Sequence, residues 1–200
     1  MLSFSAIHNS KIGQNRQNIT MPIDPGDIET ITLAGLLDQE AQARSHGSGI
    51  QATALLGDWS PQRLWGKGEL HESQGQTKLL QWLNARLSIS SSEEGQPGDL
   101  SIANSISLGP LKLRFNGPGW LQGKRPLLFF RFDRLTLELG GSTLFQRPLP
   151  EPKPKRTPFF ALISVQQDQS LVARGRGGGL ALWSATKAPE QAGAKRFSGS

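Results

Sequence analysis

The feature that most limits the fold of this chain is an alternation of apolar and polar residues with a period of two. In Leu100–Leu108, isoleucines and leucines occupy one face, and serines and an alanine occupy the other. In residues 111–115, apolar side chains alternate with Lys112 and Arg114. Successive side chains of a β-strand point to opposite faces of the sheet, so this period predicts strands with one buried face.

Further apolar segments with turn residues between them extend the pattern along the chain. Asn116-Gly117 predicts a turn after the second of these strands, and Gly140-Gly141 closes another alternating segment. The remaining predicted strands span residues 127–132, 135–139, 159–165, 171–174 and 180–183. Many short strands separated by glycine and asparagine are typical of an antiparallel barrel or sandwich, so we predict a mostly β fold.

One helix is predicted before the strands. Asp24 and Pro25 suit a helix start, because Asp caps the first turn and Pro fits the first helical position. Apolar residues then recur at helical spacing as far as about Arg44. The residues predicted to face the rest of the domain are Ile28, Ile31, Leu36, Leu37 and Ala41.

The 200-residue length fits one domain with tails. We assign residues 24–184 to the β-domain, residues 1–23 to a disordered or mis-assigned N-terminal segment, and residues 185–200 to a disordered tail. No stretch approaches the roughly 20 apolar residues that span a bilayer, so we expect no transmembrane segment.

The net charge of +6 is unevenly distributed. Residues 1–110 carry 7 Lys and Arg against 11 Asp and Glu, whereas residues 111–200 carry 15 against 5. A basic half favours an anionic partner such as a peripheral membrane surface or a nucleic acid, although a solvated basic surface is the other interpretation. The candidate contacts to an anionic surface are Lys112, Arg114, Lys124, Arg125 and Arg131.

The residue types that carry most enzyme chemistry are absent or scattered. The chain has no cysteine, which excludes disulfides, thiolate metal sites and a cysteine nucleophile. Its three histidines have no metal-binding spacing, and no serine lies in a Gly-x-Ser-x-Gly elbow. We therefore assign no catalytic or metal-binding residue and no cofactor, and we expect that the protein is not an enzyme.

Three segments, taken in order, resemble the plastid-lipid-associated (fibrillin) family, and specifically a cyanobacterial type of member. They are Leu55-Leu56-Gly57-Asp58-Trp59, then Ala103-Asn104-Ser105-Ile106, then Arg174-Gly175-Arg176 with the glycines and the hydrophobic strand after it. The family opens its barrel with a Leu-x-Gly-x-Trp segment and ends with an Arg-Gly-x-x-Gly segment. The resemblance spans about residues 30–183 and implies a lipocalin-like antiparallel β-barrel with one short N-terminal flanking helix.

In such barrels a tryptophan near the start plugs the closed end, and an arginine from near the last strand lies across its ring. The resemblance therefore implies a structural pair between Trp59 and either Arg174 or Arg176, worth about 0.5–2 kcal/mol. A barrel of about eight strands can hold one small ligand, although the same side chains can instead fill a dry core. The candidate lining residues are Leu113, Phe115, Leu127, Phe129, Leu137 and Phe160.

The function implied by the resemblance is non-catalytic binding of a lipid or another small hydrophobic molecule, such as a quinone or carotenoid, at photosynthetic membranes. The expected location is the cyanobacterial cytoplasm and thylakoid, or the plastid of a eukaryote. Two alternatives stay open. One is a tetrapyrrole chromophore lyase on a lipocalin-like barrel. The other is a nucleic-acid-binding module that uses the basic half, because Arg174-Gly175-Arg176-Gly177-Gly178-Gly179 resembles an RGG segment.

Overall fold

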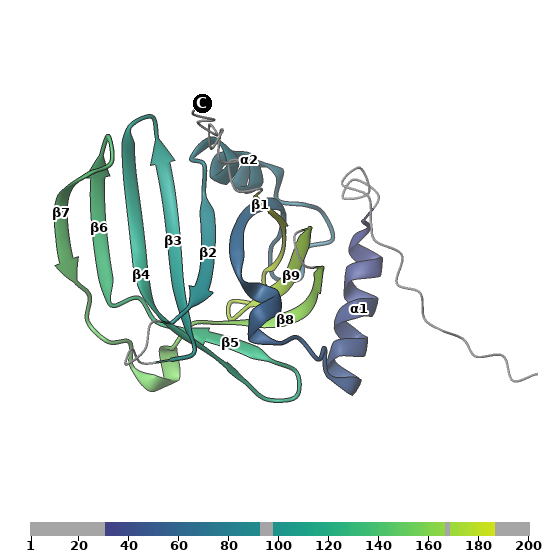
Figure 1. The fold of residues 1–200 in the computed structure, drawn as a ribbon. Coiled ribbons are helices and arrows are strands. Elements are labelled where there is room, and N and C mark those ends of the chain that lie inside the picture. Colours follow the sequence, from purple (N-terminus) through teal and green to yellow (C-terminus); the bar gives the residue numbers. More distant parts are fainter. Residues whose placement is uncertain (1–30, 93–97, 167–168, 187–200) are drawn as a thin grey trace, which may run out of the picture.

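The computed structural model describes residues 31–92, 98–166 and 169–186. Ten strands and two α-helices form most of this part of the chain (Figure 1). The helices are α1 (Leu33–His46) and α2 (Gln74–Trp82). The strands are β1 (Gly57–Trp65), β2 (Arg86–Ser91), β3 (Leu100–Leu108), β4 (Leu111–Gln122), β5 (Leu127–Phe130), β6 (Arg134–Leu139), β7 (Ser142–Pro148), β8 (Phe159–Gln166), β9 (Ser170–Gly175) and β10 (Leu180–Ala185).

Eight of the strands close into an antiparallel barrel. Their order is β3-β2-β1-β10-β9-β8-β5-β4, and β4 pairs with β3 to complete the ring. The first and last strands of the chain are neighbours, since β1 pairs with β10 from Trp59 opposite Ala185 to Trp65 opposite Leu180. The predicted lipocalin-like antiparallel β-barrel is therefore confirmed.

Strand β4 belongs to the barrel and to an extension of the sheet. Its C-terminal part pairs with β5, whereas residues 111–116 pair with β6. The β6–β7 hairpin therefore continues the sheet outside the ring, at the left of Figure 1. The predicted turn at Asn116-Gly117 is wrong, because both residues lie within β4. A Cβ atom at Gly117 would overlap the carbonyl oxygen of Arg131, so this glycine allows a close approach of two backbones rather than a turn.

The hairpin strand β7 is an element that the sequence pattern did not predict. Gly140 and Gly141, with φ of 57° and 84°, form the turn that joins it to β6. All seven residues of Ser142–Pro148 are exposed, so no buried face marks the strand in the sequence. The chain between β7 and β8 contains a short 3₁₀ segment, Pro154–Arg156.

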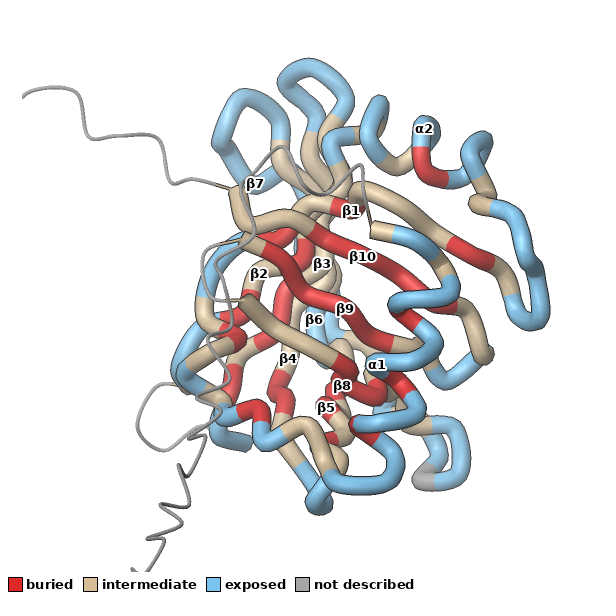
Figure 2. Tube along the Cα trace, turned by 90° about the vertical axis from the view of Figure 1, so that its right-hand side faces the viewer, coloured by how far each residue is buried: buried red, intermediate tan, exposed pale blue. Residues whose placement is uncertain are grey.

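Helix α1 packs on the outside of the barrel. The side chain of Thr32 accepts a hydrogen bond from the Gly35 amide at 3.2 Å and caps the helix. The predicted start at Asp24 and Pro25 lies outside the described residues, as do the predicted terminal segment 1–23 and most of the tail, residues 187–200. Leu36 inserts between the outward side chains of β1, β8, β9 and β10, which are Trp65, Ile163, Val172, Leu180 and Leu182. Figure 2 shows α1 beside this buried surface.

The buried face of α1 differs from the predicted one. Leu36, Glu40 and Ala43 are buried, whereas Leu37 and Ala41 are exposed. The helix therefore places a carboxylate on its buried side. A spacing of four and three residues puts these three side chains on one helical face, but an acidic residue in the middle conceals the pattern.

Helix α2 lies across one end of the barrel, at the top of Figure 1. It contacts β1, and the Gln81 side chain donates a hydrogen bond to the Pro61 carbonyl at 3.2 Å. Thr77 is its one buried residue. The sequence analysis did not predict this helix, although Leu79, Leu80 and Leu83 recur at helical spacing near its C-terminal end.

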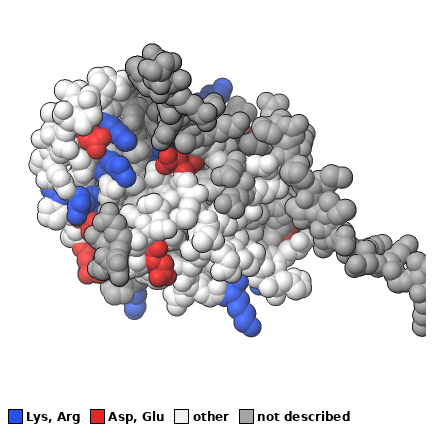
Figure 3. Space-filling view, in the orientation of Figure 1, with Lys and Arg blue, Asp and Glu red and all other residues white. Residues whose placement is uncertain are grey.

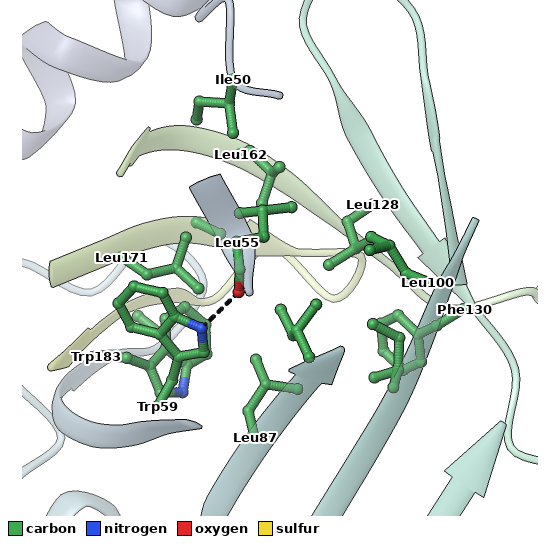
Figure 4. Packing of buried hydrophobic residues seen from close by; sticks show 14 residues of the cluster. Ile50, Leu55, Trp59, Leu87, Leu100, Leu128, Phe130, Leu162, Leu171 and Trp183 are labelled. Carbon is green, nitrogen blue, oxygen red and sulfur yellow. Dashed lines mark hydrogen bonds between the residues drawn. The ribbon is translucent and has the colours of Figure 1, made fainter. Parts of the chain in front are cut away.

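The interior of the barrel is filled at the other end. Trp59 is 1% exposed, and its indole Nε1 donates a hydrogen bond to the Leu55 carbonyl at 2.9 Å (Figure 4). Around it pack Ile50, which precedes the first strand, and inward-facing strand residues, which include Leu87, Ile89, Leu100, Ile102, Leu128, Phe130, Leu162, Leu171 and Trp183. This cluster closes the barrel behind the candidate site.

Candidate ligand site at the barrel mouth

A partly open cavity of about 410 Å³ lies in the barrel at the end covered by α2. Its walls are the inward faces of β1, β2, β3, β4, β8 and β10, and α2 contributes Leu80. Four of the lining residues are aromatic, namely Phe115, Phe132, Phe160 and Trp183. The aliphatic lining consists of Pro61, Leu64, Leu80, Ala85, Leu87 and Ile106. The barrel is therefore filled at its Trp59 end and hollow at its mouth.

The aromatic side chains form a connected series along the wall of the cavity. The ring centroids of Phe160 and Trp183 are 5.5 Å apart, and those of Phe130 and Phe160 are 5.2 Å apart. Phe132 lies 5.3 Å from Phe130 and 5.7 Å from Phe115. Such edge-to-face and offset contacts hold the rings in place, so the wall keeps its shape without a bound molecule.

Two of the six predicted lining residues, Phe115 and Phe160, line the cavity. Leu113 and Leu137 are directly opposite each other on β4 and β6, so they lie on the same face as Phe115 but farther along the extension. They do not line the cavity.

The prediction for Leu127 and Phe129 is wrong, because these side chains point out of the barrel. Their neighbours Leu128 and Phe130 are buried in the inner core, and successive residues of a strand face opposite sides. Phe129 instead stacks on Trp120 at 5.9 Å on the outer surface. Because every residue of β5 is apolar, its sequence does not indicate which face is inward.

Several lining residues were missed by sequence reasoning. Leu80 and Ala85 depend on α2, which was not predicted. Trp183 lay in a predicted strand, and only its alternation with Leu182 could have indicated that it faces the barrel interior. Both residues are buried, however, since Leu182 packs under α1 and Trp183 faces the barrel interior, so the alternation has no polar member.

Three polar residues, Arg86, Asn104 and Ser105, border this apolar space, and the strand register directs the side chain of Asn104 into it. Asn104 of β3 is directly opposite Leu87 on β2 and Phe115 on β4, and directly opposite residues share a face of the sheet. Its amide makes no hydrogen bond to another described residue. An asparagine amide offers two donors and one acceptor, so this group can bind a carbonyl or hydroxyl oxygen within the cavity.

The predicted pair between Trp59 and an arginine is wrong. Trp59 lies inside the barrel, whereas Arg174 follows the inward-facing Ala173 and therefore points outward from β9. Arg176 lies 5.8 Å above the ring of Phe159 and donates to the carbonyls of Thr157 and Lys155. The wall of the barrel separates both guanidinium groups from the indole of Trp59.

Arg174 instead binds Glu40, the buried carboxylate of α1. Its Nη2 lies 2.6 Å from Oε2 and its Nε lies 2.8 Å from Oε1. Arg125 and Arg44 also reach Oε1, at 3.1 and 2.7 Å. The pKa of Glu40 is lowered from 4.5 to about 2, chiefly by its hydrogen bond with Arg174. The hydrogen bond with Arg44 and the positive charges of both arginines lower it further, and together these effects outweigh burial, which raises the pKa. This cluster joins α1 to β9 and to the β4–β5 turn.

The five predicted basic contacts do not form one patch. Lys112 and Arg114 lie on the outer face of β4 near its N-terminal end, and Lys124 and Arg125 follow the other end of that strand. Arg125 binds Glu40, and Arg131 binds Glu151. Only Lys112 and Arg114 therefore remain together on an open surface.

Within residues 31–92, 98–166 and 169–186, no group of three or more His, Asp or Glu side chains is placed to hold a metal ion. None of the helices in this part of the chain is long and apolar enough to cross a membrane.

No family model matches the chain, and a search of curated proteins finds no match either. The resemblance to the plastid-lipid-associated family therefore stays a prediction from its three motifs.

Proposed function

We propose that the protein binds a small hydrophobic molecule in the cavity at the barrel mouth and acts as a binding protein rather than an enzyme. The observation that carries this proposal is the apolar, aromatic-lined space of about 410 Å³ between α2 and the core. Ligand sites in proteins occupy about 300–1,000 Å³ and combine an apolar lining with a few polar groups. The cavity fits both criteria.

The lining favours a flat, ring-containing ligand. Phe115, Phe132, Phe160 and Trp183 present aromatic surfaces that stack well on a planar ring. Burial of apolar surface gains about 25 cal/mol per Å², so a ligand that loses about 200 Å² of apolar surface to the cavity gains about 5 kcal/mol.

The side chain of Asn104 further limits the class of ligand that suits the cavity. A ligand in the cavity would cover the half-buried Asn104 amide, and a buried polar group without a hydrogen-bond partner costs about 1–3 kcal/mol, so a ligand that supplies such a partner is favoured. A neutral ring with a carbonyl or hydroxyl group meets this requirement. Quinones belong to this class and are among the molecules that the family resemblance suggests.

The test is a titration with menadione, a naphthoquinone, followed by quenching of tryptophan fluorescence from Trp183 in the cavity wall. The proposal expects saturable quenching that is weakened at least about tenfold in Ala85→Phe and in Ile106→Trp, because both add bulk to the cavity. The matched control is Leu127→Phe, which adds a ring on the outer surface and leaves the cavity unchanged.

Equal binding by all four proteins would overturn the proposal, provided that circular dichroism shows each variant folded. Native mass spectrometry of protein purified from a photosynthetic host then identifies the resident molecule. A co-purified bilin would favour the chromophore-lyase alternative, and a co-purified quinone or carotenoid would support the proposal.

A further inference from the structure

A second concave surface lies on the outer face of the barrel wall. We call it the polar hollow and define it by Arg86, Ser88, Ser105, Ser107, Lys112 and Arg114, which border a depression of about 750 Å³. It is formed by β2, β3 and β4 on the side opposite to Leu87, Asn104 and Phe115. Lys and Arg side chains gather over β4 and β6 in this view of the surface (Figure 3).

The strand register fixes the arrangement of these side chains. Ser105 of β3 is directly opposite Arg86 on β2 and Arg114 on β4. The three side chains therefore stand in one row across three strands, with the hydroxyl between two guanidinium groups. Lys112 is two residues from Arg114 and directly opposite Ser107. Lys112 therefore adds a third cation to the same face, and Ser107 adds a second hydroxyl.

The cations of the polar hollow are not neutralised by the rest of the described chain. Arg86, Lys112 and Arg114 form no ion pair within residues 31–92, 98–166 and 169–186. Two acidic groups are near. Asp58 borders the hollow and accepts a hydrogen bond from Ser88, and Glu138 is directly opposite Lys112 on β6. Like charges on neighbouring strands repel, so a surface of this kind gains by binding an anion.

We propose that the polar hollow binds the oxyanion of a phosphate or sulfate group. Guanidinium groups match the oxygens of such anions with paired N–H donors, and serine hydroxyls supply further donors. The polar hollow lies on the opposite face of the sheet from the barrel cavity, although Arg86 and Ser105 border both. The phosphate can belong to a soluble metabolite or to a lipid headgroup, and both present the same chemistry to the hollow.

The experiment uses the full chain labelled with ¹⁵N. Inorganic phosphate is titrated while amide signals are followed, and sedimentation with vesicles of phosphatidylglycerol is compared with vesicles of phosphatidylcholine. The variant is the double substitution Arg86→Gln and Arg114→Gln. The matched control is Lys124→Gln with Lys153→Gln, which removes two cations outside the hollow.

The proposal expects phosphate to shift the amides of Ser105 and Arg114, or anionic vesicles to bind the protein, with at least about a tenfold loss in the Arg86/Arg114 variant only. A response to free phosphate assigns a soluble ligand, and a response to phosphatidylglycerol alone assigns a headgroup.

Three results would overturn the proposal. One is the absence of any response to both probes, and another is an equal loss in both double variants, which indicates net charge rather than a site. The third is binding of a single-stranded RNA oligonucleotide without a response to phosphate or vesicles, which would assign the surface to nucleic acid. Amide spectra of both variants establish that each is folded.

Discussion

Arg174 of β9 donates hydrogen bonds to both carboxylate oxygens of Glu40, a residue 134 positions earlier in the chain. Glu40 is 3% exposed and lies between Leu36 and Ala43 on the face of α1 that contacts the barrel. The attachment of α1 to the barrel therefore combines an apolar contact through Leu36 with a charged one through Glu40.

We expect Glu40→Gln to destabilise the protein by about 2–4 kcal/mol. The substitution leaves Arg174 and Arg125, which are about a fifth to a quarter exposed, without their anionic partner. The free energy of unfolding in urea measures the effect. Glu138→Gln, on the barrel extension, is the control and should change stability by no more than about 0.5 kcal/mol. Equal stability of the two variants would show that the cluster does not hold α1.

The same cluster predicts a dependence of stability on pH. The pKa of Glu40 is lowered to about 2 in the folded protein by its hydrogen bond with Arg174, and it returns to its ordinary value near 4.5 on unfolding. The unfolded chain therefore binds the proton more tightly, so this contribution is fully present above about pH 5 and is lost as the pH falls towards 2. Urea denaturation between pH 6 and 2 should show a shallower loss in Glu40→Gln than in the native protein.

Trp59→Phe should destabilise the barrel by about 1–3 kcal/mol. The change leaves the Leu55 carbonyl without the indole donor and opens a small cavity in the closed end. Thermal unfolding measures the difference. Trp82→Phe, on the exposed side of α2, is the matched control and should leave the melting temperature within about 2 °C. An equal effect of both substitutions would contradict the structural role of Trp59.

Gly117→Ala and Gly75→Ala should have opposite effects. A methyl group at Gly117 meets the Arg131 backbone, so we expect a loss of about 2 kcal/mol or more. Gly75 lies in α2 with no atom within 4 Å of an added Cβ, so alanine should stabilise the protein by about 0.5–1 kcal/mol. Chemical denaturation of the two variants tests both signs, and stabilisation by Gly117→Ala would exclude the close approach in β4.

Asn104→Leu separates the role of the amide from that of the apolar wall. Menadione and 2-methylnaphthalene share a ring system, and only menadione has carbonyl oxygens. If Asn104 binds a ligand oxygen, the variant should lose about tenfold in affinity for menadione and retain or improve its affinity for the hydrocarbon. Competition titration gives both values, and parallel changes for the two molecules would exclude this role.

The period-two alternation predicted the barrel because most strands bury one face and expose the other. It failed for β5 and β7, where that contrast is missing, and β2 was missed although Leu87 and Ile89 alternate with polar residues. Every residue of β5 is apolar, so the direction of Phe129 could not be read, and every residue of β7 is exposed, so the strand itself was missed. Phe115 was assigned correctly because it alternates with Arg114.

Side-chain clusters that join distant segments could not be predicted from a single sequence. Nothing local distinguishes Glu40 from a solvated helical acid, and its partners lie at positions 44, 125 and 174. The RGG-like segment likewise did not predict the role of its first arginine. Arg174 serves the attachment of α1, and Gly178 accepts a hydrogen bond from it at 2.6 Å.

The pairing of β1 with β10 also has a consequence for synthesis of the chain. The other strand pairs of the ring join segments that are much nearer in sequence, whereas the β1–β10 pair brings residue 59 to residue 185. A nascent chain that lacks residues 180–185 has unpaired edges on both β1 and β9, and such edges are templates for aggregation. The barrel can therefore close only after all eight of its strands have left the ribosome, and until then both edges remain open.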